Sequence, residues 1–195
     1  MTDGPAPPGR ARRLLGLLPS YARIAWWGLL GPRREREPLV VYQAAVLGEA
    51  GLLLALRSDL MGWELPGGAA LAGETEEEAL RRELREETGL EVELLGRVGE
   101  YHRSGFRPHT ARVWRARAVG GALRPSAETP ALGWFDPLAL PWTLLPWYRG
   151  PLADALAGRP AVRIEERQGW RHVLAGLCID LAMRWRGPGP DLGGD

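Results

Sequence analysis

Three glutamates in the middle of the sequence lie at spacings that place their carboxylates on one face of a helix. Glu83, Glu86 and Glu87 are three and four residues apart, and Leu80 and Leu84 contribute to an apolar stripe on the same segment. Like charges at this spacing cost roughly a few tenths of a kcal/mol per pair unless something neutralises them. Hard cations such as Mg²⁺ take carboxylate oxygens as ligands. The spacing of the three glutamates alone is more typical of a solvated acidic helix paired by its own arginines, and a divalent-cation site is the alternative that the surrounding residues have to support.

The three glutamates belong to a longer pattern of fixed residue types. Gly68 is followed by five residues and Glu74, then by seven residues and the run Arg82-Glu83-Leu84-x-Glu86-Glu87-x-Gly89-Leu90. This pattern resembles a complete Nudix box, the loop–helix–loop motif of hydrolases that cleave nucleoside diphosphates linked to another group. The resemblance is strict over residues 68–90 and extends more loosely over about 39–157.

The resemblance implies a role for each charged residue of the box. Glu86 and Glu87 would be the main metal ligands, together with the carbonyl oxygen of Gly68. Glu83 would bind a metal directly or orient the attacking water, and Arg82 would hold the glutamates in place through charge-assisted hydrogen bonds. The implied cofactor is Mg²⁺ or Mn²⁺, because a divalent cation neutralises the phosphate oxygens and lowers the pKa of its bound water.

Many Nudix enzymes take one more carboxylate from outside the box. Glu128 is the candidate for this base or extra ligand, because it lies about forty residues beyond the box, ahead of an expected strand. Glu165 and Glu166 are rivals, since other family members place this residue elsewhere. An ordinary surface-loop position for Glu128 is the alternative.

A basic loop is predicted over residues 102–109, between two expected strands. Within it, Arg103 and Arg107 are candidates for binding substrate phosphate, and Phe106 is a candidate for stacking on a base. A solvated hairpin loop is the alternative.

The remaining elements must hold the box in place. Thr75 and Glu78 form an expected capping box, Gly89 is the expected residue after the helix end, and Glu74 is expected to support the preceding loop. Strands are predicted over 39–47, 51–56, 91–101, 110–119 and 132–135, a helix over 147–156, and a short strand or coil over 161–164. An amphipathic terminal helix is predicted over 170–185, with the stripe Trp170, Leu174, Leu177, Cys178, Leu181 and Trp185. The fold class expected from the resemblance is α/β, a Nudix-type α/β/α sandwich with a mixed β-sheet, plus N-terminal and C-terminal helical extensions.

Three regions are expected along the chain. Residues 1–37 form an N-terminal extension with a disordered tail, an apolar Trp/Leu helix and a charged linker; residues 38–186 form the Nudix domain; residues 187–195 form a disordered tail. The apolar segment 11–31 has three interpretations: a helix packed on the domain or on a second copy, a membrane-surface anchor, or a signal peptide or spanning helix.

Composition limits the function further. The net charge of +1 argues against a dedicated nucleic-acid surface, and all 25 basic residues are arginine, which excludes lysine chemistry. The single cysteine, Cys178, excludes an internal disulfide and fits a reducing, cytoplasmic compartment. Three histidines and one cysteine do not provide a zinc site of the usual kind.

The predicted function is Mg²⁺-dependent hydrolysis of the pyrophosphate bond in a nucleoside diphosphate linked to another moiety. Nucleoside triphosphates and nucleotide sugars of the ADP-ribose type are equally compatible as substrates, since Phe106 stands where the ADP-ribose group tends to carry proline. The alternatives are a non-catalytic nucleotide-binding domain and an enzyme acting on RNA 5′ ends. The expected partner is a nucleotide-type small molecule, and a homodimer is possible.

Overall fold

The computed structural model describes residues 39–105, 108–158 and 162–186. The chain divides into two units, residues 1–36 and 37–195, and every described residue belongs to the second. The predicted N-terminal helix and both predicted tails lie outside the described residues, so these remain predictions, as do the domain boundaries.

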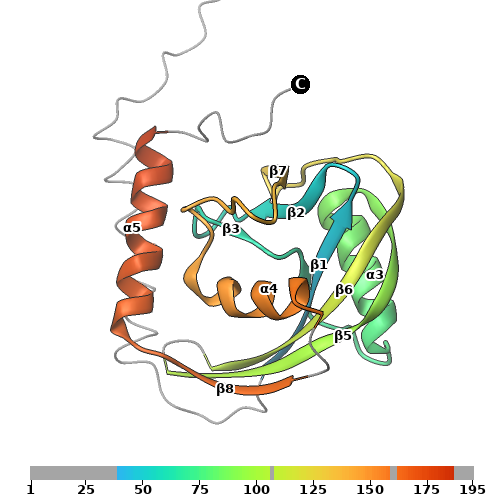
Figure 1. The fold of residues 1–195 in the computed structure, drawn as a ribbon, viewed down its shortest axis with the longest axis horizontal. Coiled ribbons are helices and arrows are strands. Elements are labelled where there is room, and N and C mark those ends of the chain that lie inside the picture. Colours follow the sequence, from blue (N-terminus) through green and yellow to red (C-terminus); the bar gives the residue numbers. More distant parts are fainter. Residues whose placement is uncertain (1–38, 106–107, 159–161, 187–195) are drawn as a thin grey trace, which may run out of the picture. The chain divides into compact units, whose positions relative to one another are not determined.

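The described unit is built on one mixed sheet of eight strands (Figure 1). Its main path has the order β3-β2-β1-β6-β5-β8, while β4 pairs with β1 and β7 pairs with β2. The strands are β1 (Leu39–Gly48), β2 (Gly51–Leu56), β3 (Trp63–Glu64), β4 (Gly67–Gly68), β5 (Leu90–Gly105), β6 (His109–Gly121), β7 (Ala131–Phe135) and β8 (Val162–Gln168). The parallel pair β1–β6 lies at the centre, and the antiparallel pair β5–β6 joins it to the edge strand β8.

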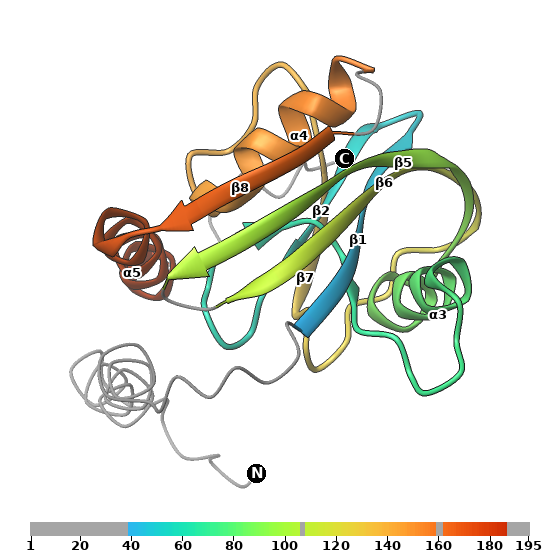
Figure 2. The ribbon, with the colours of Figure 1, turned by 90° about the horizontal axis from the view of Figure 1, so that it is seen from below.

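Helices cover both faces of this sheet (Figure 2). Helix α3 (Glu76–Thr88) packs on one face, against a cluster that includes Tyr42, Ala44 and Val46 of β1. Helices α4 (Arg149–Leu156) and α5 (Trp170–Arg186) contribute to the cluster on the other face. Because alternate residues of a strand point to opposite faces, one strand serves both clusters. The predicted α/β/α sandwich with a mixed sheet is confirmed.

Helix α3 begins and ends where local sequence signals predict. Thr75 is the N-cap residue, and its side chain and that of Glu78 exchange hydrogen bonds with each other's backbone N–H groups, so the capping box is confirmed. Gly89 ends the helix with φ of 77° in the left-handed region, which a glycine adopts without steric cost. Leu80 and Leu84 are fully buried, as their stripe predicts.

The segment predicted as a basic loop is mostly strand. Strand β5 continues to Gly105 and β6 begins at His109, so the connection is much shorter than the predicted loop. Parallel pairing of β5 with β8, from Gly99↔Val162 to Gly105↔Gln168, sustains this extension. The same pairing makes the segment predicted as a short strand or coil over 161–164 a strand of seven residues, β8.

The predicted terminal helix is confirmed as α5, but the face that packs on the domain is not the predicted stripe. The buried residues are Gly176, Ile179, Asp180 and Met183. Most of the predicted stripe lies on the exposed side, comprising Trp170, Leu174, Cys178, Leu181 and Trp185, while Leu177 is half-buried. Polar contacts explain the choice, because Asp180 is 1% exposed and accepts a hydrogen bond from the Met61 N–H at 2.6 Å. Among the described helices, none has the length and apolarity to cross a membrane.

Candidate active site

The box enters the sheet through a turn of two glycines. Strand β4 pairs with β1 in the register Tyr42↔Gly68 and Gln43↔Gly67. Gly67 has φ of +139°, and a Cβ placed there would lie 2.1 Å from the carbonyl oxygen of Tyr42. Since no side chain fits this conformation or this space, glycine is what allows the turn to lie against the central strand.

This turn meets two of the box glutamates. The N–H of Gly67 donates a hydrogen bond to Glu87 Oε2 at 2.9 Å. The carboxyl group of Glu83 lies so close to Gly68 that a Cβ on this glycine would be 2.5 Å from Glu83 Cδ. The first glycine of the pattern and the carboxylates of the helix are therefore neighbours, although fifteen or more residues separate them in the sequence.

Arg82 connects the remaining charges of the box. Its Nε and Nη2 donate to the two carboxylate oxygens of Glu74 at 2.7 and 2.9 Å, and its Nη1 donates to Glu83 at 2.9 Å and Glu86 at 3.2 Å. The hydrogen bond from Arg82, with one from the N–H of Leu71, lowers the pKa of the Glu74 carboxyl to about 2. Glu74 thus remains ionised and links the loop 69–74 to the helix, whereas the side chain of Glu86 is 62% exposed.

The loop that carries Glu128 is attached to the end of the same helix. The hydroxyl of Thr129 donates to the carbonyl oxygen of Glu87 at 2.7 Å, and the N–H of Ser58 donates to the carbonyl oxygen of Glu128 at 3.1 Å. The rival carboxylates lie on β8, where Glu165 is exposed and Glu166 forms an ion pair with Arg103 at 3.0 Å.

Glu87 is the most perturbed carboxyl group of the box. Burial, together with the negative charges of Glu64, Glu83 and Glu128, raises its pKa to about 8 against the opposing hydrogen bond from Gly67. Glu128 is thus one of the charges that raise the pKa of Glu87. The site has an excess of negative charge around one buried carboxyl group.

Glu64, one of the carboxylates that raise the pKa of Glu87, is not among the site residues predicted from the sequence. It is 8% exposed in β3, and its Oε2 accepts hydrogen bonds from the Tyr148 hydroxyl at 2.6 Å and Arg57 Nη1 at 3.0 Å. Burial raises the pKa of this carboxyl, against the opposing effect of Arg57. The available signal is an ionisable residue inside the otherwise apolar run Trp63-Glu64-Leu65-Pro66. Gln43 Nε2 donates to Tyr148 at 3.0 Å and extends the network to β1.

These carboxylates fit a divalent cation by their chemistry. Carboxylate and carbonyl oxygens are the ligands of hard cations, and a bound cation would compensate the charge that raises the pKa of Glu87. In the described ranges, no three His, Cys, Asp or Glu side chains converge into a complete metal-binding group. Glu83 and Glu86 each accept a hydrogen bond from Arg82 through one carboxylate oxygen.

Of the three predicted substrate residues, Arg103 is the one that the described part of the chain contains, and it is not on a loop. Arg103 lies within β5, and its side chain is 1% exposed. Its guanidinium donates to Glu166 and to the carbonyl oxygen of Trp147 at 2.6 Å, and it lies 5.6 Å from the ring centroid of Tyr148. The placement of Arg103 on an exposed loop is therefore wrong, because pairing with β8 buries it; a contact with substrate stays a prediction. Phe106 and Arg107 lie outside the described residues.

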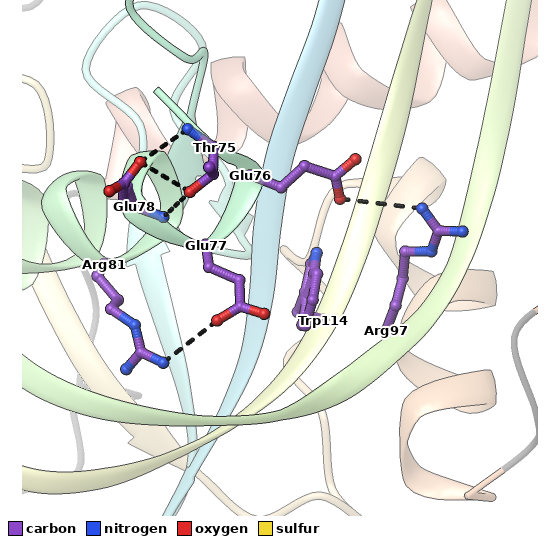
Figure 3. A pocket seen from close by; sticks show the side chains of 7 residues that line it. All are labelled: Thr75, Glu76, Glu77, Glu78, Arg81, Arg97 and Trp114. Carbon is purple, nitrogen blue, oxygen red and sulfur yellow. Dashed lines mark hydrogen bonds and ion pairs between the residues drawn. The ribbon is translucent and has the colours of Figure 1, made fainter. Parts of the chain in front are cut away.

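A surface hollow of about 610 Å³ lies beside the first turn of α3 (Figure 3). Its lining includes Glu76, Glu77 and Arg81, but not Gly68 or the box glutamates 83, 86 and 87. The charges that line it are already paired, with Glu77 3.6 Å from Arg81 and Glu76 3.9 Å from Arg97. The carboxylates described above, and not this hollow, are the candidate for chemistry.

Comparison with known proteins identifies the family of the chain. The family model described as the NUDIX domain matches residues 38–155. The chain belongs to the Nudix family and is a Nudix pyrophosphohydrolase, as the box predicts. Nudix hydrolases generally use a divalent metal ion.

Three relatives illustrate the range of similarity. A Bacillus subtilis (strain 168) protein whose name refers to an 8-oxo-dGTP diphosphatase is 34% identical over 133 residues, covering 68% of this chain and 87% of its own. The CTP pyrophosphohydrolase of Escherichia coli (strain K12) is 38% identical over 133 residues, covering 60% and 94%. The crystal structure of an ADP-ribose pyrophosphatase from Streptococcus suis has a TM-score of 0.55 and 28% identity, covering 66% of this chain and 99% of that one.

Proposed function

We propose that this protein hydrolyses nucleoside triphosphates to a nucleoside monophosphate and pyrophosphate, with Mg²⁺ as cofactor. The observation that carries the proposal is the position of Glu87, which is close to Gly67 and under the electrostatic influence of Glu64, Glu83 and Glu128. A buried carboxyl group surrounded by other carboxylates is stabilised in its ionised form by a cation. A nucleoside triphosphate also binds Mg²⁺ through its phosphate oxygens, so the same cation can link the carboxylates to the substrate.

Each residue has a distinct part in the proposed reaction. Glu86, Glu87 and the carbonyl oxygen of Gly68 hold Mg²⁺, and Glu83 either joins them or orients the water that attacks phosphorus. When bound, Mg²⁺ neutralises phosphate oxygens and lowers the pKa of water. Arg82 keeps the carboxylates in register through the hydrogen bonds described above.

The proton of the attacking water needs an acceptor. We assign this role to Glu128, whose carboxylate accepts the proton as the oxygen–phosphorus bond forms. The contact of Thr129 with the end of α3 supports this choice, because it keeps the Glu128 loop beside the box.

The substrate class is supported by the relatives. The names of two of them refer to nucleoside triphosphates, 8-oxo-dGTP and CTP. Cleavage of ADP-ribose is the second candidate, because the crystal structure named as an ADP-ribose pyrophosphatase aligns with this chain over 99% of its own length. A non-catalytic role is disfavoured, because all the glutamates of the box are present.

The deciding experiment is a hydrolysis screen with the full chain in Mg²⁺ or Mn²⁺. The panel contains the common dNTPs and NTPs, 8-oxo-dGTP, ADP-ribose, nucleotide sugars, dinucleoside polyphosphates, coenzyme A and 5′-triphosphate RNA. We expect a nucleoside triphosphate to have the highest kcat/KM and to release pyrophosphate, and chelation of the metal to stop turnover. ADP-ribose or RNA as the preferred substrate would overturn the substrate assignment.

A matched pair of variants tests the site itself. Glu87→Gln should lower kcat by about 10³-fold or more while the fold is retained, since one metal ligand loses its charge. Glu91→Gln, which removes an exposed carboxylate from β5, should have no effect on turnover. Activity of Glu87→Gln near that of the unmodified chain would refute the assignment.

A further inference from the structure

The segment that enters the Nudix box changes its partner strand just before the turn proposed to bind metal. Strand β3 ends at Glu64 and pairs with β2, whereas β4, which begins at Gly67, pairs with β1. Between the two strands, the carbonyl oxygen of Pro66 accepts a hydrogen bond from the N–H of Ala44 at 3.0 Å, and Pro66 has no N–H of its own to donate. The position of the turn Gly67–Gly68 therefore depends on what holds β3 and β1 together at this crossing.

The hydroxyl group of Tyr148 bridges these two strands. It donates a hydrogen bond to Glu64 Oε2 on β3 at 2.6 Å and accepts one from Gln43 Nε2 on β1 at 3.0 Å. Gln43 is the residue of β1 that pairs with Gly67 of β4. The three bridging residues are buried, so bulk water does not compete for these hydrogen bonds.

The amide of Gln43 depends on this hydroxyl. Its Nε2 makes the hydrogen bond to Tyr148, and its Oε1 is buried without a partner in the described part of the chain. Without the hydroxyl, both ends of the amide would be unpaired, whereas Glu64 would keep its hydrogen bond from Arg57 Nη1 at 3.0 Å. Loss of the hydroxyl would therefore disturb the β1 side of the bridge, opposite Gly67, more than the β3 side.

The position of Tyr148 is itself fixed by the backbone that precedes α4. Tyr148 is the last residue of the 3₁₀ turn η1 (Pro146–Tyr148). The segment before this turn is bound to Trp63, whose N–H donates to the carbonyl oxygen of Thr143 and whose carbonyl oxygen accepts from the N–H of Leu145, each at 3.0 Å. The hydroxyl is therefore a fixed point to which the entry segment is attached.

The other side of the same turn meets the box. The N–H of Gly67 donates to Glu87 Oε2 at 2.9 Å, and the next residue, Gly68, carries the carbonyl oxygen proposed as a metal ligand. Gln43 and Gly67 thus connect the Tyr148 hydroxyl to a proposed metal ligand. Altering a residue that orients metal ligands typically weakens metal binding by about 10- to 100-fold.

We propose that Tyr148 is a positioning residue for the candidate active site. Its hydroxyl, held between Glu64 and Gln43, fixes the turn Gly67–Gly68 beside α3, so that the carbonyl oxygen of the turn and the carboxylates of the helix are arranged for a divalent cation. Tyr148 itself contacts neither the cation nor the substrate. The inference rests on the proposed function, because it concerns the metal site assigned there.

Tyr148→Phe tests this role because it removes the hydroxyl and leaves the ring and every charge of the site in place. The probe is Mn²⁺, added to the full chain without substrate and followed by the electron paramagnetic resonance signal of the free ion. We expect Tyr148→Phe to bind Mn²⁺ about tenfold more weakly than the unmodified chain, and Gln43→Leu, which removes the other side of the bridge, to weaken binding to a similar extent. The double variant should bind little more weakly than either single variant, because both substitutions remove the same bridge.

Tyr101→Phe is the matched control. The Tyr101 hydroxyl also belongs to a buried side chain and donates to a carboxylate, Asp154 Oδ2, at 2.9 Å, but it joins β5 to α4 and not β3 to β1. This variant should lose stability in urea unfolding as Tyr148→Phe does, while binding Mn²⁺ normally, because a purely structural hydrogen bond does not orient a metal ligand.

Unchanged Mn²⁺ affinity in either Tyr148→Phe or Gln43→Leu would overturn the proposal. Equal weakening in Tyr101→Phe would also overturn it, because the effect would then follow from lost stability. If Tyr148→Phe does not fold, the affinity of Gln43→Leu decides the question. Failure of the unmodified chain to bind Mn²⁺ would refute the proposed metal site and this inference with it, whereas normal binding by all variants would refute this inference alone.

Discussion

Replacing Glu87 by glutamine should change how the stability of the metal-free protein depends on pH. In the folded protein, burial and neighbouring carboxylates raise the pKa of Glu87 to about 8, from an ordinary value of 4.5. Between these two values the folded chain holds a proton that the unfolded chain has released. The free energy of unfolding therefore falls as pH rises, and the stabilisation present below pH 4.5 is lost as pH passes through about 8.

The size of the effect follows from the two pKa values. The slope is about 1.4 kcal/mol per pH unit in the middle of this range, and it flattens as the pH reaches the folded-state pKa. Between pH 6 and 8 the expected loss from Glu87 is about 2 kcal/mol. This is a measurable part of the stability of an ordinary domain, which is about 5–15 kcal/mol.

Urea unfolding in the presence of EDTA measures this effect as a difference. The unmodified chain and Glu87→Gln are unfolded at pH 6, 7 and 8, and the difference between their unfolding free energies cancels the titration of all other groups. We expect the variant to gain about 2 kcal/mol relative to the unmodified chain over this range, while Glu91→Gln tracks the unmodified chain. A difference that stays constant from pH 6 to pH 8 would refute the reasoning. Excess Mg²⁺ should abolish the slope between pH 6 and 8, because a bound cation favours ionised Glu87 over this range.

Three other predictions use different contacts. Glu128→Gln should lower kcat by about 10²-fold or more with little change in KM, whereas Glu165→Gln should have little effect; the opposite result would assign the extra carboxylate to β8. Gly68→Ala should retain the fold but lower turnover by about tenfold or more, because the new Cβ displaces the Glu83 carboxylate. Gly67→Ala should lower the free energy of unfolding in urea by more than about 2 kcal/mol, because its Cβ meets a backbone carbonyl oxygen. Equal stability of the two variants would contradict this reasoning. Arg103→Ala should lower the unfolding free energy by about 2 kcal/mol, since it removes a buried guanidinium that pairs with the partly buried Glu166 and donates to the carbonyl oxygen of Trp147; an unchanged stability would show that these contacts are not structural.

The box and its helix could be predicted from the sequence because they depend on residues close together in the chain. The capping box spans four residues, the helix stacks side chains three and four positions apart, and Gly89 ends the helix through its own backbone conformation. These interactions form in the same way whatever surrounds the helix. The residue types and spacing were therefore sufficient to predict helix α3 and, through the resemblance, the fold class and the family. The catalytic and metal-binding roles of the carboxylates stay predictions.

The surroundings of the box were decided only by the tertiary structure. Glu64, Tyr148 and Glu87 come together through the pairing of β4 with β1 and the packing of the segment before α4, and no local pattern encodes those contacts. Arg103 reads as a phosphate ligand in the sequence, yet pairing of β5 with β8 buries it against Glu166.

Helix α5 shows the same limit most plainly. Its periodicity predicts an apolar stripe correctly, but periodicity does not state which face meets the domain. The burial of Asp180 with Met61 and Arg184, and the fit of Gly176 against Trp147, select the opposite face. A buried carboxylate must keep its hydrogen-bond partners, whereas exposed apolar side chains carry a smaller cost, so the polar contacts determine the orientation and leave the stripe outward.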